Sequence, residues 1–255
     1  MNKYAVVTRA KDNFKEIAQI THPVLQAYAK RCDADFIVIS EDKYNLGSFH
    51  YEIFQSYDLF DTYERLLIID SDILIAPSCP NIFKIVPEQC VATIFEDKYS
   101  RKRNRKMWIQ KAQQAWGDIG WREGYMNMGV FVCSRCHRRL FDIKHNKIWM
   151  DMGYADVSFR YYIHKYEYPI YELPYKFNHM SMFSEVGKNR LKSYIIHYAG
   201  RGFSSKKSRA EQIKSDLRIL QRVRNRFWLN FYNVPERLRL LAIGTLNFVK
   251  SAFYK

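Results

Sequence analysis

The chain has 255 residues, of which 47% are hydrophobic and 16% aromatic, a length and composition that allow a large buried core and exclude an intrinsically disordered protein. Its 41 Lys and Arg against 26 Asp and Glu give a formal net charge of +15 at pH 7, which predicts an anionic partner such as nucleic acid, a phosphorylated substrate or an anionic lipid. The sequence contains no apolar run of the ~20 residues that span a bilayer, and its start lacks the apolar core of a secretory signal.

Short β-rich runs alternate with helical patterns through the first two thirds of the chain, which is typical of an α/β fold. The first run, YAVVT over residues 4–8, predicts a strand, and the apolar spacing after it predicts a helix over 17–29 that is interrupted by Pro23. We expect further strands over 35–40, 65–70, 90–95, 126–134, within 168–178 and over 193–200, and further helices over 53–60 and 154–166.

Five cysteines are scattered through the chain, an odd number that favours reduced thiols in the cytosol. Cys133 and Cys136 have C-x-x-C spacing and His137 follows them, but no second pair of cysteines stands at the spacing of a zinc site. We therefore expect free, buried cysteines at the end of a strand.

The composition changes from Arg201 onward, where the last 55 residues hold 13 Lys and Arg against 3 Asp and Glu. Apolar residues recur at helical spacing on both sides of Pro235. This pattern predicts a basic amphipathic helical tail over 204–255 that follows a first domain over 1–203. The apolar positions are Ile213, Leu217, Leu220, Phe227 and Phe231 before the proline, and Leu238, Leu241, Ala242, Phe248, Val249 and Ala252 after it.

The stretch LLIIDSDILI, residues 66–75, places two carboxylates inside an apolar run of strand length. Ionised side chains are costly to bury without compensation. Because side chains alternate along a strand, we expect Asp70 and Asp72 to face one way and Ser71 the other. A divalent cation between the carboxylates would turn their repulsion into coordination, and hard oxygen ligands suit Mg²⁺ or Mn²⁺. The alternative is that the two aspartates lie in a solvated turn. The apolar residues ILI that follow directly, residues 73–75, argue against such a turn.

This stretch resembles the Asp-x-Asp segment of glycosyltransferase family 8, and three more segments follow in the order that the family has. YMNMGVFVCS is similar to the Tyr-Phe-Asn-Ala-Gly-Val strand of the family and aligns Asn127 and Gly129 with its Asn and Gly. YADVSFRYYI resembles the helix opening Asp-Gln-Asp and aligns Asp156 with the first Asp. YIIHYAGRGF resembles the closing His-x-x-Gly and supplies His197 and Gly200.

The resemblance implies a metal-dependent glycosyltransferase of the GT-A fold, which is an α/β, Rossmann-like mixed sheet flanked by helices. The implied reaction moves a hexose from a UDP-linked donor to a saccharide or lipid-linked saccharide acceptor, with retention of configuration. Asp70, Asp72 and His197 would hold Mn²⁺ or Mg²⁺ at the donor diphosphate. The chemistry agrees, because a diphosphate leaving group develops charge that a Lewis acid can neutralise without a proton.

The resemblance also implies roles for the other matched positions. Asn127 and Asp156 take catalytic places near the donor sugar and the acceptor. The nucleotide-binding set is Val7, Thr8, Arg9, Ser71 and Gly200, with Ser71 near the ribose, and the sugar-binding set is Glu96, Asp97 and Gly129.

Some segments depart from the family pattern. The closing segment reads HYAGRGFSSKK where the family continues to Lys-Pro-Trp, so the cation that contacts the phosphate is left open among Arg201, Lys206 and Lys207. The first strand is followed by TRAKDN in place of Asp-Asp-x-Tyr. These departures leave open the nucleotide, the sugar and the choice between retention and inversion of configuration, of which the family resemblance favours retention.

Two other classes of protein share part of this pattern. A haloacid-dehalogenase-like phosphatase also has Asp-x-Asp after an apolar strand, but near the start of the chain and with a later acidic loop. A nucleic-acid-binding protein would explain the net charge and the basic run over 99–108, but not the carboxylates with His197. We interpret RKRNRK, residues 101–106, as a mobile solvated loop near the acceptor.

The tail composition predicts a location at the cytoplasmic face of the inner membrane, and the alternative is that its apolar stripes pack on the first domain or on a partner chain. Lys and Arg combined with large apolar side chains are typical of helices that lie in a membrane interface, where each basic residue adds on the order of 1 kcal/mol on an anionic leaflet. The large side chains are Phe227, Trp228, Phe231, Leu241, Phe248 and Phe253.

Overall fold

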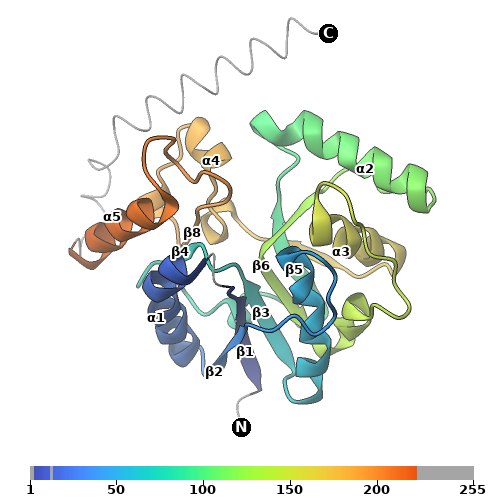
Figure 1. Cartoon of the computed structure of the whole chain (residues 1–255), viewed down its shortest axis with the longest axis horizontal. Helices are drawn as coiled ribbons and strands as arrows, with labels where there is room; N and C mark the ends of the chain where they lie inside the picture. Colours follow the sequence, from blue (N-terminus) through green and yellow to red (C-terminus); the bar gives the residue numbers. More distant parts are fainter. Residues whose placement is uncertain (1–2, 12–13, 223–255) are drawn as a thin grey trace, which may run out of the picture.

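The computed structural model describes residues 3–11 and 14–222. A six-stranded mixed sheet with the strand order β2-β1-β3-β6-β5-β7 lies at its centre (Figure 1). Strand β1 is parallel to β2 and β3, β6 is antiparallel to β3 and β5, and β7 is parallel to β5. This arrangement confirms the predicted α/β fold with a mixed sheet. The strands are β1 Tyr4–Arg9, β2 Ala34–Ile39, β3 Arg65–Ile69, β5 Val91–Phe95, β6 Met126–Ser134 and β7 Ile170–Glu172.

Helices cover both faces of the sheet, α1 and α5 on one side and α2 and α3 on the other (Figure 1). The alternation of side chains along β3 explains both cores, because Leu67 and Ile69 pack with Leu25 of α1 whereas Leu66 and Ile68 pack with residues of α2 and α3. The helices are α1 Lys15–Arg31, α2 Lys102–Trp116, α3 Tyr154–Lys165, α4 Ser181–Glu185 and α5 Arg209–Arg222.

Several local predictions need correction. Helix α1 continues through Pro23, and its buried face, with Leu25 in the core, holds it against the sheet. The predicted helix over 53–60 is a 3₁₀ helix, Phe49–Asp61. The expected mobile loop over 101–106 instead enters α2, because Ile109 and Ala112 bury one face of this helix in the core.

The chain leaves the large sheet at the two aspartates. Strand β3 ends at Ile69, residues 70–72 form a break, and β4 Ile73–Ile75 pairs antiparallel with β8 Ile195–His197 in a separate two-stranded sheet. The strand expected over 65–70 is therefore confirmed as β3, and the end of the apolar run over 66–75 forms a second strand in another sheet. Two backbone hydrogen bonds secure the break, from Asp70 N–H to Gly129 O at 3.0 Å and from Tyr198 N–H to Asp72 O at 3.0 Å.

The first part of the predicted tail is packed on the domain. Helix α5 lies against α1, and its buried Ala210, Ile213 and Leu220 join a cluster with residues of β4 and β8. The rest of that prediction, residues 223–255, lies outside the described residues, and so do its positions Phe227, Trp228 and Phe231 and all those after Pro235. The domain boundary after residue 203 stays a prediction. Within the described ranges, no helix combines the length and the apolar character needed to cross a membrane.

A buried ion pair anchors α5, which yields the first prediction. The Asp216 carboxylate, 1% exposed, accepts hydrogen bonds from Arg190 Nε at 2.6 Å and from the Tyr198 hydroxyl at 2.7 Å. Asp216→Ala should lower the free energy of unfolding by about 3–5 kcal/mol, because removal of one member of a buried pair leaves the opposite charge uncompensated. Urea denaturation measures the loss. The exposed Arg218→Ala on the same helix should stay within ~0.5 kcal/mol of wild type, and equal losses in the two variants would contradict the prediction.

Candidate active site

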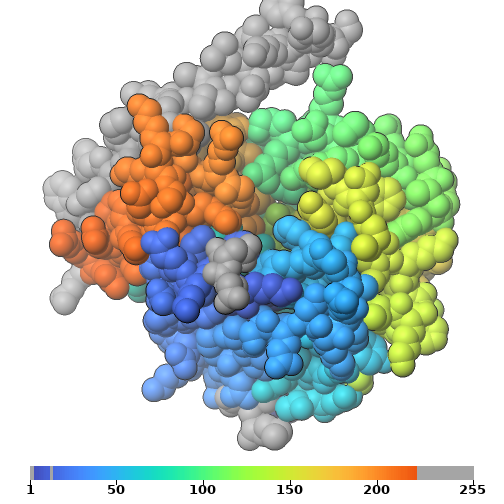
Figure 2. Space-filling view, viewed as in Figure 1, coloured from blue at the N-terminus to red at the C-terminus, as the bar shows by residue number. Residues whose placement is uncertain are grey.

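A cavity of about 560 Å³ opens at the carboxyl ends of β1 and β3, the edge of an α/β sheet where ligands commonly bind. Figure 2 shows a hollow between the segment coloured orange and the segments coloured yellow and green. Residues from β1, the break after β3, β6, the start of α3, the end of β8 and the first residue of α5 line the cavity. Its volume is within the range of sites that hold small-molecule ligands.

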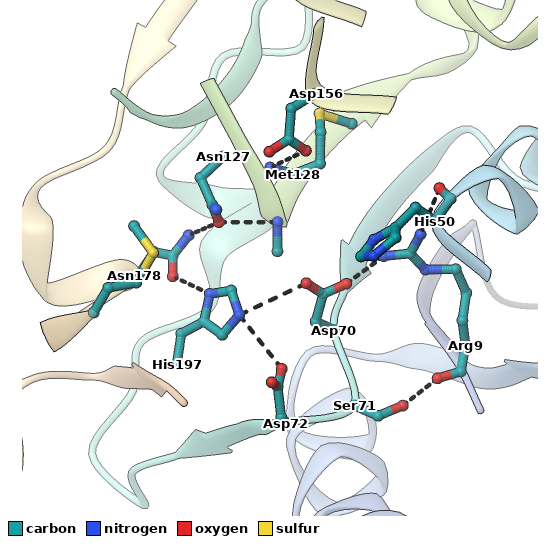
Figure 3. Close-up of polar contacts among 12 residues, drawn as sticks. Arg9, His50, Asp70, Ser71, Asp72, Asn127, Met128, Asp156, Asn178 and His197 are labelled. Carbon is teal, nitrogen blue, oxygen red and sulfur yellow. Dashed lines mark hydrogen bonds and ion pairs between the residues drawn. The ribbon is translucent and has the colours of Figure 1, made fainter. Parts of the chain in front are cut away.

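Asp70, Asp72 and His197 converge at the base of this cavity (Figure 3). One ligand atom from each lies within 4.8 Å of the others. His197 Nε2 is 3.7 Å from Asp70 Oδ2 and 3.4 Å from Asp72 Oδ1. Two carboxylate oxygens and an imidazole nitrogen form a donor set that suits Mn²⁺ or Mg²⁺. These residues therefore fit the predicted metal.

A chain of amides orients the His197 ring (Figure 3). His197 Nδ1 lies 3.0 Å from Asn178 Oδ1, and Asn178 Nδ2 donates to Asn127 Oδ1 at 2.9 Å. Asn127 Oδ1 also accepts the N–H of Gly129 at 3.0 Å. Because Asn178 presents its oxygen to His197, Nδ1 carries the proton and the Nε2 lone pair is directed at the carboxylates.

Gly129 gives the His197 ring its space. A Cβ at position 129 would lie 2.3 Å from His197 Cε1 and 2.8 Å from Nδ1, which is closer than non-bonded atoms approach. Glycine is required here for close packing, and any side chain would displace the imidazole.

Two arginines compensate the carboxylates. Arg9 Nη2 pairs with Asp70 Oδ1, and Arg209 Nη1 lies 2.6 Å from Asp72 Oδ2. Each guanidinium occupies one oxygen of its carboxylate, while the second oxygen faces His197. The arginines therefore leave the convergent oxygens accessible to a cation.

The buried charges at this site perturb one another. Burial lowers the pKa of His197, but the nearby Asp72 and Asp70 carboxylates outweigh it and raise this pKa above its usual value. Burial raises the pKa of Asp72, and the positive charges of His197 and Arg209 outweigh it, so this pKa is low. A metal ion at Nε2 would therefore compete with a proton for this nitrogen.

A second acidic group lies on the other side of the cavity. Burial, followed by the charges of Glu96 and Asp70, raises the pKa of Asp156 to about 8. The Glu96 carboxylate pairs with two arginines, with Arg105 Nη2 2.7 Å from Oε1 and Arg101 on Oε2. At neutral pH the Asp156 carboxyl is thus mainly protonated and can donate a hydrogen bond.

The cavity brings together ten of the thirteen residues predicted from the sequence. Val7 and Thr8 are buried in β1 and do not line it. The Asp97 carboxylate instead accepts the backbone N–H groups of Gly124 and Tyr125 at 2.8 and 3.0 Å. The ten are Arg9, Asp70, Ser71, Asp72, Glu96, Asn127, Gly129, Asp156, His197 and Gly200.

Ser71 faces away from the two aspartates, as expected. Its hydroxyl bonds the carbonyl of Arg9 and lies 3.3 Å from the Thr8 hydroxyl. The sequence left three candidates for the cation that contacts the phosphate, namely Arg201, Lys206 and Lys207. All three side chains are exposed and do not line the cavity.

Sequence reasoning missed several residues at the site. Arg101 and Arg105 are four residues apart, a helical spacing that could have connected them to one carboxylate. Asn178 and Arg209 carry no such signal, because tertiary folding alone brings them to His197 and Asp72. The aromatic side chains Phe14, Phe49, Trp108 and Tyr154 also line the cavity.

The C-x-x-C segment lies outside this site. Cys133 and Cys136 are free thiols, the first buried and the second exposed. His137 Nδ1 accepts the N–H of Ser134 at 2.9 Å, and its Nε2 is 3.1 Å from the carbonyl of Gln89. Both ring nitrogens therefore serve the backbone at the end of β6.

Comparisons with known proteins agree with this architecture. The sequence model described as Glycosyl transferase family 8 matches residues 4–202. No curated protein gave a significant sequence match.

Among solved structures, a glycosyltransferase involved in the glycosylation of the major capsid of PBCV-1 has a TM-score of 0.56 at 14% identity, covering 83% of this chain and 98% of that one. The galactosyltransferase LgtC, in complex with donor and acceptor sugar analogs, has a TM-score of 0.59 at 14% identity, with 87% and 96% covered. The glycosyltransferase GlyE of Streptococcus pneumoniae has a TM-score of 0.53 at 15% identity, with 87% and 63% covered. At these identities the structures show a shared fold.

The raised pKa of Asp156 predicts a pH-dependent stability. The folded protein holds this proton up to about pH 8, whereas an unfolded Asp loses it near pH 4, so the Asp156 contribution to stability falls as pH rises between these values. In EDTA, Asp156→Asn should unfold at least ~2–4 °C higher than wild type at pH 8.5, a gain of about 1 kcal/mol, and the gap should shrink toward pH 5. Thermal unfolding at both pH values measures it.

The control for this experiment is Asp61→Asn, because the Asp61 side chain is 65% exposed. A gap between Asp156→Asn and wild type that did not grow with pH, or that Asp61→Asn reproduced, would contradict the assignment.

Proposed function

The chain belongs to glycosyltransferase family 8, and from this membership we propose that it transfers a hexose from a UDP-linked donor to a saccharide or lipid-linked saccharide, assisted by Mn²⁺ or Mg²⁺. The observation that carries the proposal is the convergence of Asp70, Asp72 and His197 in the cavity. Glycosyltransferase family 8 includes neither phosphatases nor nucleic-acid-binding proteins, so we set aside these two alternatives.

The donor diphosphate would lie over these three residues. A divalent cation held by them would neutralise the charge that develops on the departing diphosphate. Arg9, at the carboxyl end of β1, adds a fixed positive charge beside Asp70. Phe14 and Phe49 stack with ring centroids 5.1 Å apart at this side of the cavity, and they offer an apolar surface for the nucleobase.

The sugars would lie on the opposite side, toward β6 and α3. Asn127 is fixed by its bonds to Asn178 and Gly129, so its position is set before the substrate binds. The protonated carboxyl of Asp156 can donate a hydrogen bond to a sugar hydroxyl. We propose transfer with retention of configuration on the family resemblance.

We also propose that the enzyme works at the cytoplasmic face of the inner membrane on a lipid-linked acceptor. The support is the composition of residues 223–255, where six Lys and Arg stand against the single acidic residue Glu236. Aromatic side chains such as Trp228 accompany these charges, a combination that favours an anionic lipid surface.

The proposed metal site predicts a loss of donor binding when one carboxylate is neutralised. With Mn²⁺ present, UDP at 100 times its dissociation constant should stabilise wild type by about 2.7 kcal/mol, and Asp72→Asn should remove most of this gain together with sugar transfer from UDP-hexoses. Thermal-shift and transfer assays measure the two effects. Asp61→Asn is the control with an exposed carboxylate. Full transfer by Asp72→Asn in EDTA would refute the metal-site proposal, and stabilisation by GDP or CMP alone would refute UDP as the donor nucleotide.

The membrane proposal predicts an effect of removing residues 223–255. A chain that ends at Arg222 keeps α5 and the cavity, so we expect unchanged UDP binding but loss of sedimentation with phosphatidylglycerol-containing vesicles. Vesicles of phosphatidylcholine alone are the control for charge. Equal sedimentation of the two chains, or no sedimentation of the full chain, would refute membrane attachment through these residues.

A further inference from the structure

Arg209 lies outside the family-matched segment and reaches Asp72, one of the two aspartates of the candidate metal site. The family match ends at residue 202, and Arg209 is the first residue of α5. Its Nη1 lies 2.6 Å from Asp72 Oδ2 and the residue lines the cavity. The side chain is 28% exposed, so it faces both the carboxylate and the cavity.

Buried polar contacts hold α5 in the position that delivers this side chain. Asp216, about two turns further along the same face of the helix, pairs with Arg190 and the Tyr198 hydroxyl. Gln212, which is 4% exposed, accepts the N–H of Phe203 and donates to three carbonyls of the loop over 201–207. The start of α5 is therefore fixed to the end of β8.

Arg9 and Arg209 approach the same part of the cavity from two elements. The guanidinium carbon of Arg9 lies 5.4 Å from the ring centroid of Phe49, and that of Arg209 lies 5.1 Å from that of Phe14. These two rings are stacked on each other. The two guanidinium groups thus flank one aromatic pair, next to the two aspartates.

The charge balance of this group changes when a divalent cation binds. In the metal-free protein the two arginines offset the two aspartates, one on each. A divalent cation bound to the aspartates would offset the same two negative charges, which leaves the arginines as an excess of two positive charges. A diphosphate that links a nucleoside to a sugar carries two negative charges, and guanidinium groups bind phosphate oxygens in a bidentate manner.

We propose that Arg209 is a donor-binding residue, which neutralises Asp72 in the metal-free protein and turns to the diphosphate of the donor when the metal binds. The proposal rests on the proposed function, because it takes the nucleotide-linked donor from there. This role makes α5 part of the active site. It also couples metal binding to donor binding, because a cation on the aspartates frees Arg209 to bind the negatively charged diphosphate.

The test separates metal binding from nucleotide binding in the full-length protein. Mn²⁺ alone is titrated by electron paramagnetic resonance, and UDP is titrated by calorimetry at saturating Mn²⁺. The variants are Arg209→Ala, Arg209→Gln and Arg209→Lys, with Arg218→Ala as the control because this arginine is exposed on the same helix. Thermal unfolding in EDTA checks that each variant is folded.

Arg209→Ala and Arg209→Gln should bind UDP about 10- to 100-fold more weakly, the usual effect of removing one charged hydrogen-bonding partner. Their affinity for Mn²⁺ alone should not fall, because the side chain that competes for Asp72 is absent. Arg209→Lys keeps the charge and should lie between these variants and wild type, and Arg218→Ala should match wild type.

Two results would overturn the role of Arg209 while leaving the proposed function intact. The first is UDP affinity within threefold of wild type in a folded Arg209→Ala or Arg209→Gln. The second is an equal loss of affinity for Mn²⁺ alone and for UDP, because Arg209 would then act only by holding Asp72. If wild type binds none of UDP, GDP and CDP with Mn²⁺, the proposed function itself is wrong and this inference is wrong with it.

Discussion

The need to place two carboxylates and an imidazole together below the protein surface governs the architecture of this glycosyltransferase. Asp70 and Asp72 lie where the chain passes from the large sheet to the small one, and the antiparallel register of β4 with β8 brings His197 beside them. Such a group is stable only if its charges are compensated and its geometry is fixed. The packing against Gly129 and the amide chain through Asn178 supply the fixed geometry.

The compensating charges come from both ends of the described chain. Arg9 belongs to the first strand and Arg209 to the last described helix, so the site closes only when α5 has docked on α1 and the small sheet. The buried Asp216 pair that anchors α5 thus has a functional consequence, because it sets the position of Arg209. If Arg209 binds the donor as proposed, one helix that the family match does not include connects stability with donor binding.

The two sides of the cavity differ in their electrostatics. Around Asp70 and Asp72, two arginines balance the two carboxylates in pairs, and a bound metal ion would shift this balance. On the other side, Glu96 pairs with the arginines that α2 and the turn before it provide, and burial together with the charge of Glu96 raises the pKa of Asp156. The carboxyl groups and arginines on that side can form hydrogen bonds with a hydroxyl-rich substrate, whereas the first side suits a diphosphate with its cation.

The sequence by itself determined the α/β class, most strand positions and the carboxylate pair, because the alternation of apolar residues and the order of four short motifs are local signals. It also indicated ten of the residues that line the cavity. Helix α2 was not predicted, because its first turn is basic and its apolar face is short. Only the tertiary structure decided that the strand breaks at Asp70, that Asn178 orients His197 and that Arg209 reaches Asp72. Those contacts join residues 19 to 137 positions apart, and such distances depend on how the sheets and α5 pack, which no local pattern encodes.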